Sequence, residues 1–438
     1  MTGVVVTGIG AVSPAGVGII PLWKAVSSGR SLLKGMMDSA NEAVLGGFEF
    51  GSVAIGEVPD LEKHLDSLPR EVRRLDRFVQ LAVLAASEAV QDSGLENKML
   101  SDARAGIAFA TAICGTTTLE REFVRVTGSG MNPVDPNAVS HDLYLAAMSN
   151  TPAIVLSAML GTQGPVLALS TGCVGGIDAV GAACAAIEDG EADVMIAGAS
   201  EAPITPITIA SFEIINCLSR RTQGPPSTAS RPFDAERDGF VLAEGSGFLV
   251  LESADHARAR GARPYMRIGG FALASNARHM TALEAGGRDL ARAMGFAVDR
   301  SGVDPRDIEH VSAHGSSTIQ NDRCGTTAIK KTLGDHAYEV PVTSVKSMIG
   351  HPLSAASTIE LVVCAKSFQE DFLSPTANYE AFDPECDLNY VPGSGVEWLG
   401  RSGQRVRWAA CCHDPSCNWL IGDDSTWLMM WRSRGSGA

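Results

Sequence analysis

The feature that most constrains the fold is a regular alternation of short apolar strands with helical patterns in the second part of the chain. The strand candidates are Tyr265–Phe271, Ile308–Ser312 and Val340–Ser344, and the helix candidates are Gly287–Ser301, Asn321–Leu333 and Leu353–Phe368. A helix between two strands carries the chain back to the start of the sheet, so this order favours parallel pairing. We therefore expect an α/β protein, a layered body with a largely parallel sheet.

The first part of the chain holds similar elements. The β-branched or apolar runs Gly3–Ile9, Asp193–Ala197 and Phe248–Leu251 predict buried strands. A helix is expected over Pro69–Gly94, because the segment opens with proline, keeps apolar residues at helical spacing and closes with glycine. We expect two halves, residues 1–253 and 254–438, which meet near Ser253–Pro264.

Composition excludes several classes of protein. Of 438 residues 45% are hydrophobic and 19% charged, the profile of a tightly packed globular chain. Fifty acidic against 35 basic residues leave a net charge of −15, which disfavours nucleic acid and anionic membranes as partners.

The start, MTGVVVTGIG, has no signal-peptide pattern, and no apolar run reaches the roughly 18 residues of a membrane span. We expect a cytoplasmic protein whose ten cysteines are mostly reduced.

The sharpest local signal is the segment LSTGCVGGIDAVG around Cys173, a strand end, a tight turn and then a helix rich in small residues. A thiol at a helix start meets backbone N–H groups and the positive end of the helix dipole, which favour the thiolate. Cys173 is therefore a candidate nucleophile; the alternative is a buried structural cysteine.

Two further segments place a histidine just after a predicted strand. One is HVSAHGSST with His314, and the other is TSVKSMIGHP with Lys346 and His351. Because strand ends in one sheet converge on one side, Cys173 and both histidines are expected to line one pocket, with Lys346 projecting from the same loop.

These motifs resemble those of the β-ketoacyl synthases: STGC carries their cysteine, SAHGSST…ND the first histidine, and SVKSMIGH the lysine and second histidine. The stretches TGIGAVSPAG, SRPFDAERDGFVLAEG, NARHMTAL and DPECDLNYVP are closest to the ketosynthase α subunits of bacterial type II polyketide synthases, and the likeness runs to about Gly400. It implies the thiolase-like fold, two similar halves in an α-β-α-β-α body.

The resemblance also implies a reaction. Cys173 would accept an acyl chain from the phosphopantetheine thioester of an acyl carrier protein, and its N–H would be one oxyanion donor. His314 and His351 would bind the malonyl thioester carbonyl during decarboxylation, and Lys346 would keep the surroundings of His314 in order. No bound cofactor and no metal are expected.

The partners implied are an acyl carrier protein and either a homologous chain-length-factor-like subunit, giving a heterodimer, or a second copy of the chain. Two other functions stay open: a fatty-acid elongating synthase, and a catalytically impaired chain-length-factor-like subunit. Cys173 argues against the second, because those subunits lack the cysteine.

A basic patch is expected near the start of the Pro69 helix, at Arg70, Arg73, Arg74 and Arg77. Carrier proteins are acidic, so this patch is a candidate docking surface. The alternative is an ordinary solvated helix face, with neighbours such as Glu71.

The sequence departs from the family at two places. Gly325 stands where the family has a glutamate. Near the end, CCHDPSCNW replaces the family's Gly-Phe-Gly-Gly turn and asparagine, which puts Asp414 at the gate and oxyanion position and Pro415 in the turn.

A zinc site at Cys411, Cys412, His413 and Cys417 is disfavoured, because adjacent cysteines fit one tetrahedral site poorly. Five of six tryptophans also fall at or after Trp398, which points to a diverged tail or a change of reading frame.

Overall fold

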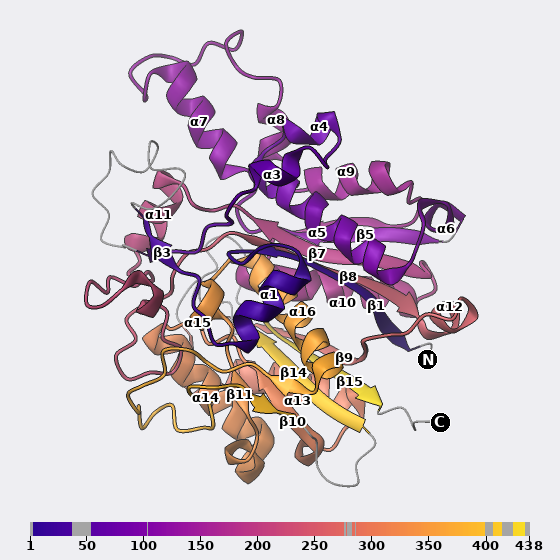
Figure 1. The fold of residues 1–438 in the computed structure, drawn as a ribbon, viewed down its shortest axis with the longest axis vertical. Coiled ribbons are helices and arrows are strands. Elements are labelled where there is room, and N and C mark those ends of the chain that lie inside the picture. The colour runs from indigo at the N-terminus through magenta and orange to yellow at the C-terminus, as the bar shows by residue number, and fades with distance from the viewer. Residues whose placement is uncertain are drawn as a thin grey trace.

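A computed structural model describes residues 3–36, 54–102, 104–275, 277, 283–284, 286–398, 406–413 and 424–433. Its central feature is an 11-stranded mixed sheet in the order β11-β10-β14-β15-β9-β1-β8-β7-β5-β6, with β2 beside β1 (Figure 1). The strands of the first half are β1 (Val4–Ser13), β2 (Gly16–Val17), β5 (Ala105–Ala110), β6 (Val166–Leu169), β7 (Val194–Glu201) and β8 (Gly245–Ser253). Those of the second are β9 (Met266–Ser275), β10 (Ile308–Ser312), β11 (Val342–Thr343), β14 (Val406–His413) and β15 (Asp424–Ser433).

The two halves of this sheet have the same topology. In the first, β6, β5 and β7 are parallel, and β8 and β1 follow in antiparallel pairs. In the second, β11, β10 and β14 are parallel, and β15 and β9 follow in antiparallel pairs. The halves join through a short antiparallel pairing of Val4–Val6 with Met266–Ile268. The expected thiolase-like arrangement of two similar halves is confirmed.

The expectation of a largely parallel sheet is wrong for its centre, where β7, β8, β1, β9, β15 and β14 pair antiparallel. The physical reason lies in the connections. Between β7 and β8 the described chain forms only the short helix α11 (Pro206–Glu213) and the 3₁₀ turn η3 (Pro226–Thr228), not a long crossover helix. Parallel neighbours need such a crossover, whereas antiparallel strands do not.

Helices form the remaining layers. On the first half lie α1 (Ile19–Ser27), α3 (Glu62–Leu65), α4 (Arg70–Arg73), α5 (Arg77–Ser93), α6 (Asn97–Asp102), α7 (Thr116–Thr127), α8 (Leu143–Ala147), α9 (Thr151–Leu160) and α12 (Ala254–Ala259). The second half carries α13 (Arg288–Ser301), α14 (Ile319–Leu333) and the turns η4 (Pro305–Asp307) and η5 (Gly334–Tyr338). Between the halves lie α10 (Gly175–Glu188) and α16 (Ser354–Glu370), preceded by η2 (Gly172–Val174) and α15 (Lys346–Ile349). Two small ribbons complete the fold, β3 (Lys34–Gly35) with β4 (Ala54–Ile55), and β12 (Phe372–Leu373) with β13 (Val396–Glu397).

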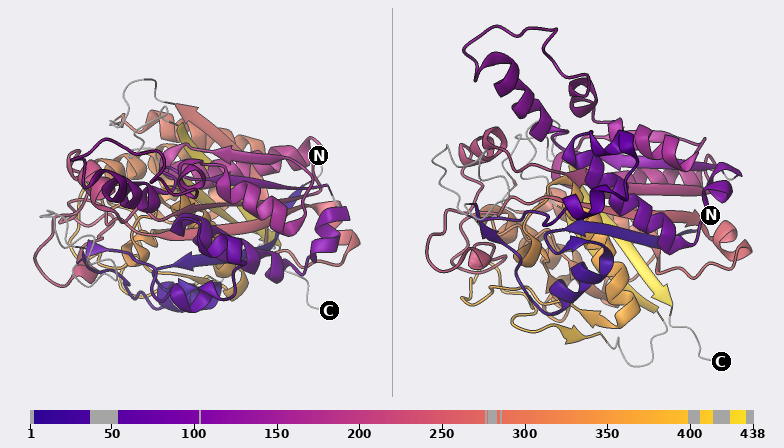
Figure 2. Two further views of the ribbon diagram at one scale, coloured as in Figure 1. Left: turned by 90° about the horizontal axis from the view of Figure 1, so that it is seen from above. Right: turned by 45° about the horizontal axis from the view of Figure 1, so that its top comes forward.

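This arrangement gives five layers. Helix α5 packs on β1, β8 and β7, whereas α13 packs on β9 and β15 at the opposite face. Helices α10 and α16 contact each other and strands of both halves, so they form the middle layer. Figure 2 shows α7 and the segment after it projecting from this body. The α-β-α-β-α order is therefore present.

The prediction of one continuous helix over Pro69–Gly94 is wrong, because the segment forms two helices, α4 and α5. Asp76 takes an extended conformation at the break and caps α5, and its Oδ1 accepts a hydrogen bond from Phe78 N at 3.1 Å. A carboxylate at this position satisfies a backbone donor that the helix cannot. The expected end is confirmed, since Gly94 caps α5 with a left-handed φ of 70°.

The three largest buried apolar clusters of the described chain form most of the core. One lies between the halves around α10 and α16, the second lies under α5, and the third lies under α13 and α14. Within the described part of the chain, no helix has both the length and the apolar character needed to cross a membrane.

Candidate active site

Cys173 lies between β6 and α10, in the short turn η2, and its side chain is buried. The start of α16 packs directly on this turn. Ser354 Oγ donates to Gly172 O at 2.6 Å, and Ile177 N donates to Ser357 Oγ at 2.9 Å. A side chain at Gly176 would place Cβ 2.5 Å from Ser354 O, so only glycine permits this approach of the two helices. The cysteine therefore sits at a helix start that α16 holds in place.

The two histidines face each other. His314 follows β10 and His351 follows α15; both are buried, and their ring centroids lie 5.0 Å apart at an interplanar angle of 79°. The ring of Phe240 lies edge-on to that of His351, with centroids 5.1 Å apart, and Phe240 belongs to the same apolar cluster as Cys173. Phe240 thus connects the pair of histidines to the buried cluster that contains Cys173.

The turns that carry Cys173 and His351 come together through two helices, and not through neighbouring strand ends as expected. Cys173 follows β6, and Lys346 and His351 follow β11, which lie at opposite ends of the sheet order. They meet because α10 and α16, which extend from these two turns, pack against each other in the middle layer. Since β6 and β11 hold equivalent places in the two halves, the site joins two equivalent strand ends.

Lys346 is fully buried and contacts the His314 segment directly. Its Nζ donates to His314 O at 2.7 Å and lies 2.5 Å from Glu360 Oε1 of α16. A buried cation requires such a partner, because its hydration has been lost. Lys346 is thereby placed to hold the backbone at His314.

The segment after β10 is held along its length. Gly315 O accepts from Ser344 Oγ at 2.8 Å, and Ser317 O accepts from Gly239 N at 3.1 Å. Gly315 has φ 44°, and a Cβ there would lie 2.5 Å from Ser344 Cβ, so the sharp turn needs glycine. These contacts fix the backbone that carries His314.

The surroundings of Cys173 are apolar. The buried cluster around it comprises Met36, Ile55, Ile204, Ile209, Phe212, Leu218, Phe240, Leu242 and Leu353. Such a lining suits an apolar chain attached to the thiol, because contact with it removes hydrocarbon from water. A thiol at a helix start, in a buried apolar cluster whose Phe240 contacts the ring of His351, can accept an acyl group and hold it out of water.

Two buried acids at the site were not identified from the sequence. Glu201, at the end of β7, accepts hydrogen bonds from Ala112 N and Thr111 Oγ1, and burial raises its pKa to about 7 although these bonds act in the opposite direction. Glu360 is the partner of Lys346. The signal for Glu360 is a single acid inside the apolar run of α16, which calls for a buried cation nearby.

Two further positions singled out in the sequence are Gly325 and Asp414. Gly325 is in α14, and a Cβ there would meet nothing within 4 Å among the described atoms, so the structure has space where the family has a glutamate. Asp414 and the turn after it lie outside the described residues. In the part of the chain that is described, no group of three or more His, Cys, Asp or Glu side chains could hold a metal ion.

The four arginines do not share one surface. Arg70, Arg73 and Arg74 line an open hollow of about 450 Å³ together with Glu71. Arg77 points inward instead and pairs with the buried Glu244 at 2.7 Å. The surface patch therefore consists of three arginines, because the fourth neutralises a buried carboxylate.

Comparison with known proteins gives matches along most of the chain. The model of the β-ketoacyl synthase N-terminal domain matches residues 1–257, and that of the C-terminal domain matches residues 265–380. The chain is 46% identical to a putative polyketide β-ketoacyl synthase 1 of Streptomyces cyaneus, over 89% of this chain and 91% of the relative. It is 42% identical to the tetracenomycin polyketide synthase ketoacyl synthase α subunit of Streptomyces glaucescens, over 90% and 91%.

Solved structures are similar as well. A type II polyketide synthase ketosynthase, bound to the hexaketide and in complex with its acyl carrier protein, matches with a TM-score of 0.87 and 36% identity, over 98% of each chain. The ishigamide ketosynthase/chain length factor matches with a TM-score of 0.84 and 28% identity, again over 98% of each chain.

The Lys346–Glu360 pair predicts a specific pattern of stabilities. Lys346→Met leaves Glu360 buried without its cation and should lower the free energy of unfolding by about 3–5 kcal/mol. Replacing both residues, Lys346→Met with Glu360→Leu, should restore most of that loss, because an apolar pair needs no hydration. Urea denaturation gives the free energy of unfolding of the parent, of Lys346→Met and of the double variant.

The control for that series is Lys63→Met, which removes an exposed ion pair with Asp60 and should cost less than about 1 kcal/mol. A double variant no more stable than Lys346→Met alone would contradict the coupling of the two buried charges.

Proposed function

Since the chain belongs to the β-ketoacyl synthase family, we propose that it is a ketosynthase that extends a polyketide chain by decarboxylative condensation with malonyl units carried on an acyl carrier protein. The observation that carries this proposal is the placement of Cys173 at the start of α10, in a buried cluster whose Phe240 contacts the ring of His351, which in turn faces the ring of His314. Residues 1–253 supply the nucleophile, and residues 254–438 supply both histidines.

The first step is acyl transfer. The thiolate of Cys173 attacks the thioester carbonyl, the bond to the carrier's phosphopantetheine sulfur breaks, and the acyl chain remains on Cys173. The phosphopantetheine arm belongs to the substrate and not to this chain. The apolar cluster around Cys173 receives the acyl chain.

The second step uses the histidines. The bond between the malonyl carboxylate and its methylene carbon breaks, CO₂ leaves, and the electron pair forms an enolate on the thioester. His314 and His351 donate hydrogen bonds to the enolate oxygen, which stabilises the charge that develops there. The enolate carbon then attacks the acyl carbonyl on Cys173, and the thiol is released.

The two alternative functions are less well supported. A 3-oxoacyl-[acyl-carrier-protein] synthase 2 of Synechocystis is 38% identical to this chain, against 46% for the polyketide relative from S. cyaneus. A silent chain-length-factor-like subunit would have no use for a cysteine nucleophile, and Cys173 is present in the expected turn. The expected cytoplasmic location is part of the proposal and can be tested by cell fractionation.

We also propose a second ketosynthase-fold chain as a subunit partner. The edge strand β6 pairs only with β5 in the described structure, and its side chains are only partly buried. Helices α7 and α8 expose Phe123, Val124 and Tyr144, with 55%, 46% and 68% of their surface accessible. An open strand edge and exposed large apolar side chains are each typical of a surface covered by another chain. One of the similar structures is itself a ketosynthase/chain length factor.

The carrier protein is proposed to dock at the hollow lined by Arg70, Arg73 and Arg74. Arg73 is tied to Asp66 at 2.9 Å, and Arg74 lies 3.5 Å from Asp142, so both cations are oriented on the surface. A cationic hollow on a protein with net charge −15 is a local attraction for an acidic partner.

Cys173 is predicted to carry the acyl chain. After incubation with an acyl-carrier thioester, peptide mass spectrometry should find the added mass on Cys173, and Cys173→Ala should abolish it. Cys184→Ala is the matched control, because Cys184 is also buried in α10 but lies apart from the site.

His314→Ala and His351→Ala should each lower malonyl decarboxylation by on the order of 10²-fold, since each removes a donor to the enolate. Acylation at Cys184, or full decarboxylation in both histidine variants, would refute the assignment.

The subunit partner predicts an obligate interface of more than about 2,000 Å². Phe123→Asp on α7 should disrupt assembly in analytical ultracentrifugation, whereas Phe296→Asp on α13, also half exposed, should not. A stable and active monomer at low micromolar concentration would rule the partner out.

The docking hollow predicts an effect on KM. Arg70→Glu and Arg74→Glu should each raise KM for malonyl carrier protein by about 3–10-fold, and the effect should weaken with salt. The rate with malonyl-pantetheine, which lacks the carrier, should not change. Arg258→Glu on the exposed face of α12 is the control, and an equal effect of this substitution would remove the hollow from the docking surface.

A further inference from the structure

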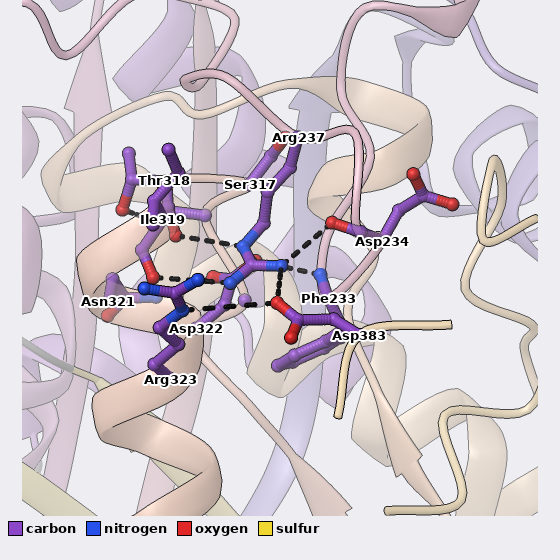
Figure 3. Close-up of polar contacts among 12 residues, drawn as sticks. Phe233, Asp234, Arg237, Ser317, Thr318, Ile319, Asn321, Asp322, Arg323 and Asp383 are labelled. Carbon is purple, nitrogen blue, oxygen red and sulfur yellow. Dashed lines mark hydrogen bonds and ion pairs between the residues drawn. The ribbon is translucent and has the colours of Figure 1, made fainter. Parts of the chain in front are cut away.

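Arg237 lies in the loop before β8 and is almost fully buried, with 1% of its side chain exposed. Figure 3 shows its guanidinium between three segments that are distant in the sequence. Nη1 donates to Asp234 O and to Asp383 Oδ2, each at 2.7 Å. Nε donates to Thr318 O at 3.4 Å, and Nη2 donates to Ile319 O at 3.3 Å. One side chain thus links its own loop to the loop of Asp383 and to the segment that begins α14.

Two of the carbonyls contacted by Arg237, those of Thr318 and Ile319, belong to the segment that carries His314. Along this segment the acceptors at His314, Gly315 and Ser317 already receive donors from Lys346, Ser344 and Gly239. Arg237 supplies donors to the next two carbonyls. The backbone from His314 to the start of α14 is therefore held by groups from other parts of the chain.

Arg237 is also the cation between two buried carboxylates. Its Nε lies 3.5 Å from Asp322 Oδ2, and its Nη1 contacts Asp383. Asp322 Oδ2 in turn accepts from Phe233 N at 2.7 Å. Burial raises the pKa of Asp322, and the charge of Arg237 acts in the opposite direction. Without Arg237 the start of α14 would hold an acid without its main counter-charge.

We propose that Arg237 is a positioning residue for His314, and that it serves the decarboxylation step and not the acylation step. The reason for the split is that the Cys173 turn is held by different groups, Ser354 and Ser357 of α16. Loss of the Arg237 contacts would let the His314 backbone move while the nucleophile keeps its own support. Small displacements of a catalytic group reduce the rate strongly, because the donor must meet the developing charge. The inference rests on the proposed function.

Arg231 provides a matched control. It lies in the same buried cluster, with 2% of its side chain exposed, and pairs with Asp234 at 3.2 Å and Glu380 at 3.1 Å. The hydrogen bonds described for its guanidinium go to these two carboxylates, whereas those of Arg237 reach the His314 segment. Arg231→Met and Arg237→Met therefore remove comparable buried charges, but only the second removes donors from that segment.

The experiment compares Arg237→Met, Arg237→Lys and Arg231→Met, with rates corrected for the folded fraction. Arg237→Met should lower kcat for malonyl decarboxylation by about 10-fold or more, and leave KM and Cys173 acylation within about 3-fold of the parent. Arg237→Lys keeps the charge but loses the fork of donors, so an intermediate loss is expected, and this variant serves if the methionine variant does not fold. Arg231→Met should leave the ratio of the two rates unchanged.

Hydrogen–deuterium exchange separates this inference from the proposed function. Amides in residues 314–322 should exchange faster in Arg237→Met than in Arg231→Met, whether or not the parent is active. An equal loss of both rates in the two methionine variants, or equal exchange, would show a role in stability alone and overturn the proposal. If the parent neither acylates Cys173 nor decarboxylates malonate, the proposed function fails and the exchange result alone decides the role of Arg237.

Discussion

The close contact between α10 and α16 is the constraint on which the rest of the structure depends. These helices fill the space between the two half-sheets, and each starts at one part of the site. Small residues at the crossing, Gly176 against Ser354 and Ser357, bring the backbones together. The two serine hydroxyls also bind the Cys173 turn and the start of α10: Ser354 Oγ donates to Gly172 O, and Ser357 Oγ accepts from Ile177 N. A larger side chain at Gly176 would separate the halves and also separate the thiol from the histidines.

The duplicated topology explains how one site can draw on two halves. In each half a parallel trio of strands lies farthest from the junction of the halves, and the chain turns into a middle-layer helix after the outermost strand. In the first half this turn holds Cys173, and in the second it holds Lys346 and His351. In the proposed mechanism the equivalent turns of the two halves supply the nucleophile on one side and hydrogen-bond donors to the enolate on the other.

Local pattern predicts much of this from the sequence. Strand β10 occupies Ile308–Ser312 as expected, and the cysteine and histidine motifs follow strands. The break at Asp76 could not be predicted from apolar spacing, because it depends on a side chain that also accepts from Thr118 N, 42 residues away. The antiparallel centre of the sheet, the Lys346–Glu360 pair and the inward turn of Arg77 are likewise long-range effects. Periodicity reports which face of an element is buried, but it does not report which residue lies opposite.

The distribution of charge around the site follows the chemistry proposed for it. The buried cluster around Cys173 is apolar, and burial raises the pKa of Glu201, at the end of β7, to about 7. The segment that carries His314 contacts two buried cations, Lys346, which is paired with Glu360 of α16, and Arg237, which is paired with Asp322 of α14. A neutral acyl chain would bind beside the first environment, and an anionic malonyl group would react beside the second. Because each cation is fixed by a buried partner, Lys346 can hold the carbonyl of His314, and Arg237 those of Thr318 and Ile319, without moving toward the substrate. The imidazoles are then left as the donors that meet the enolate.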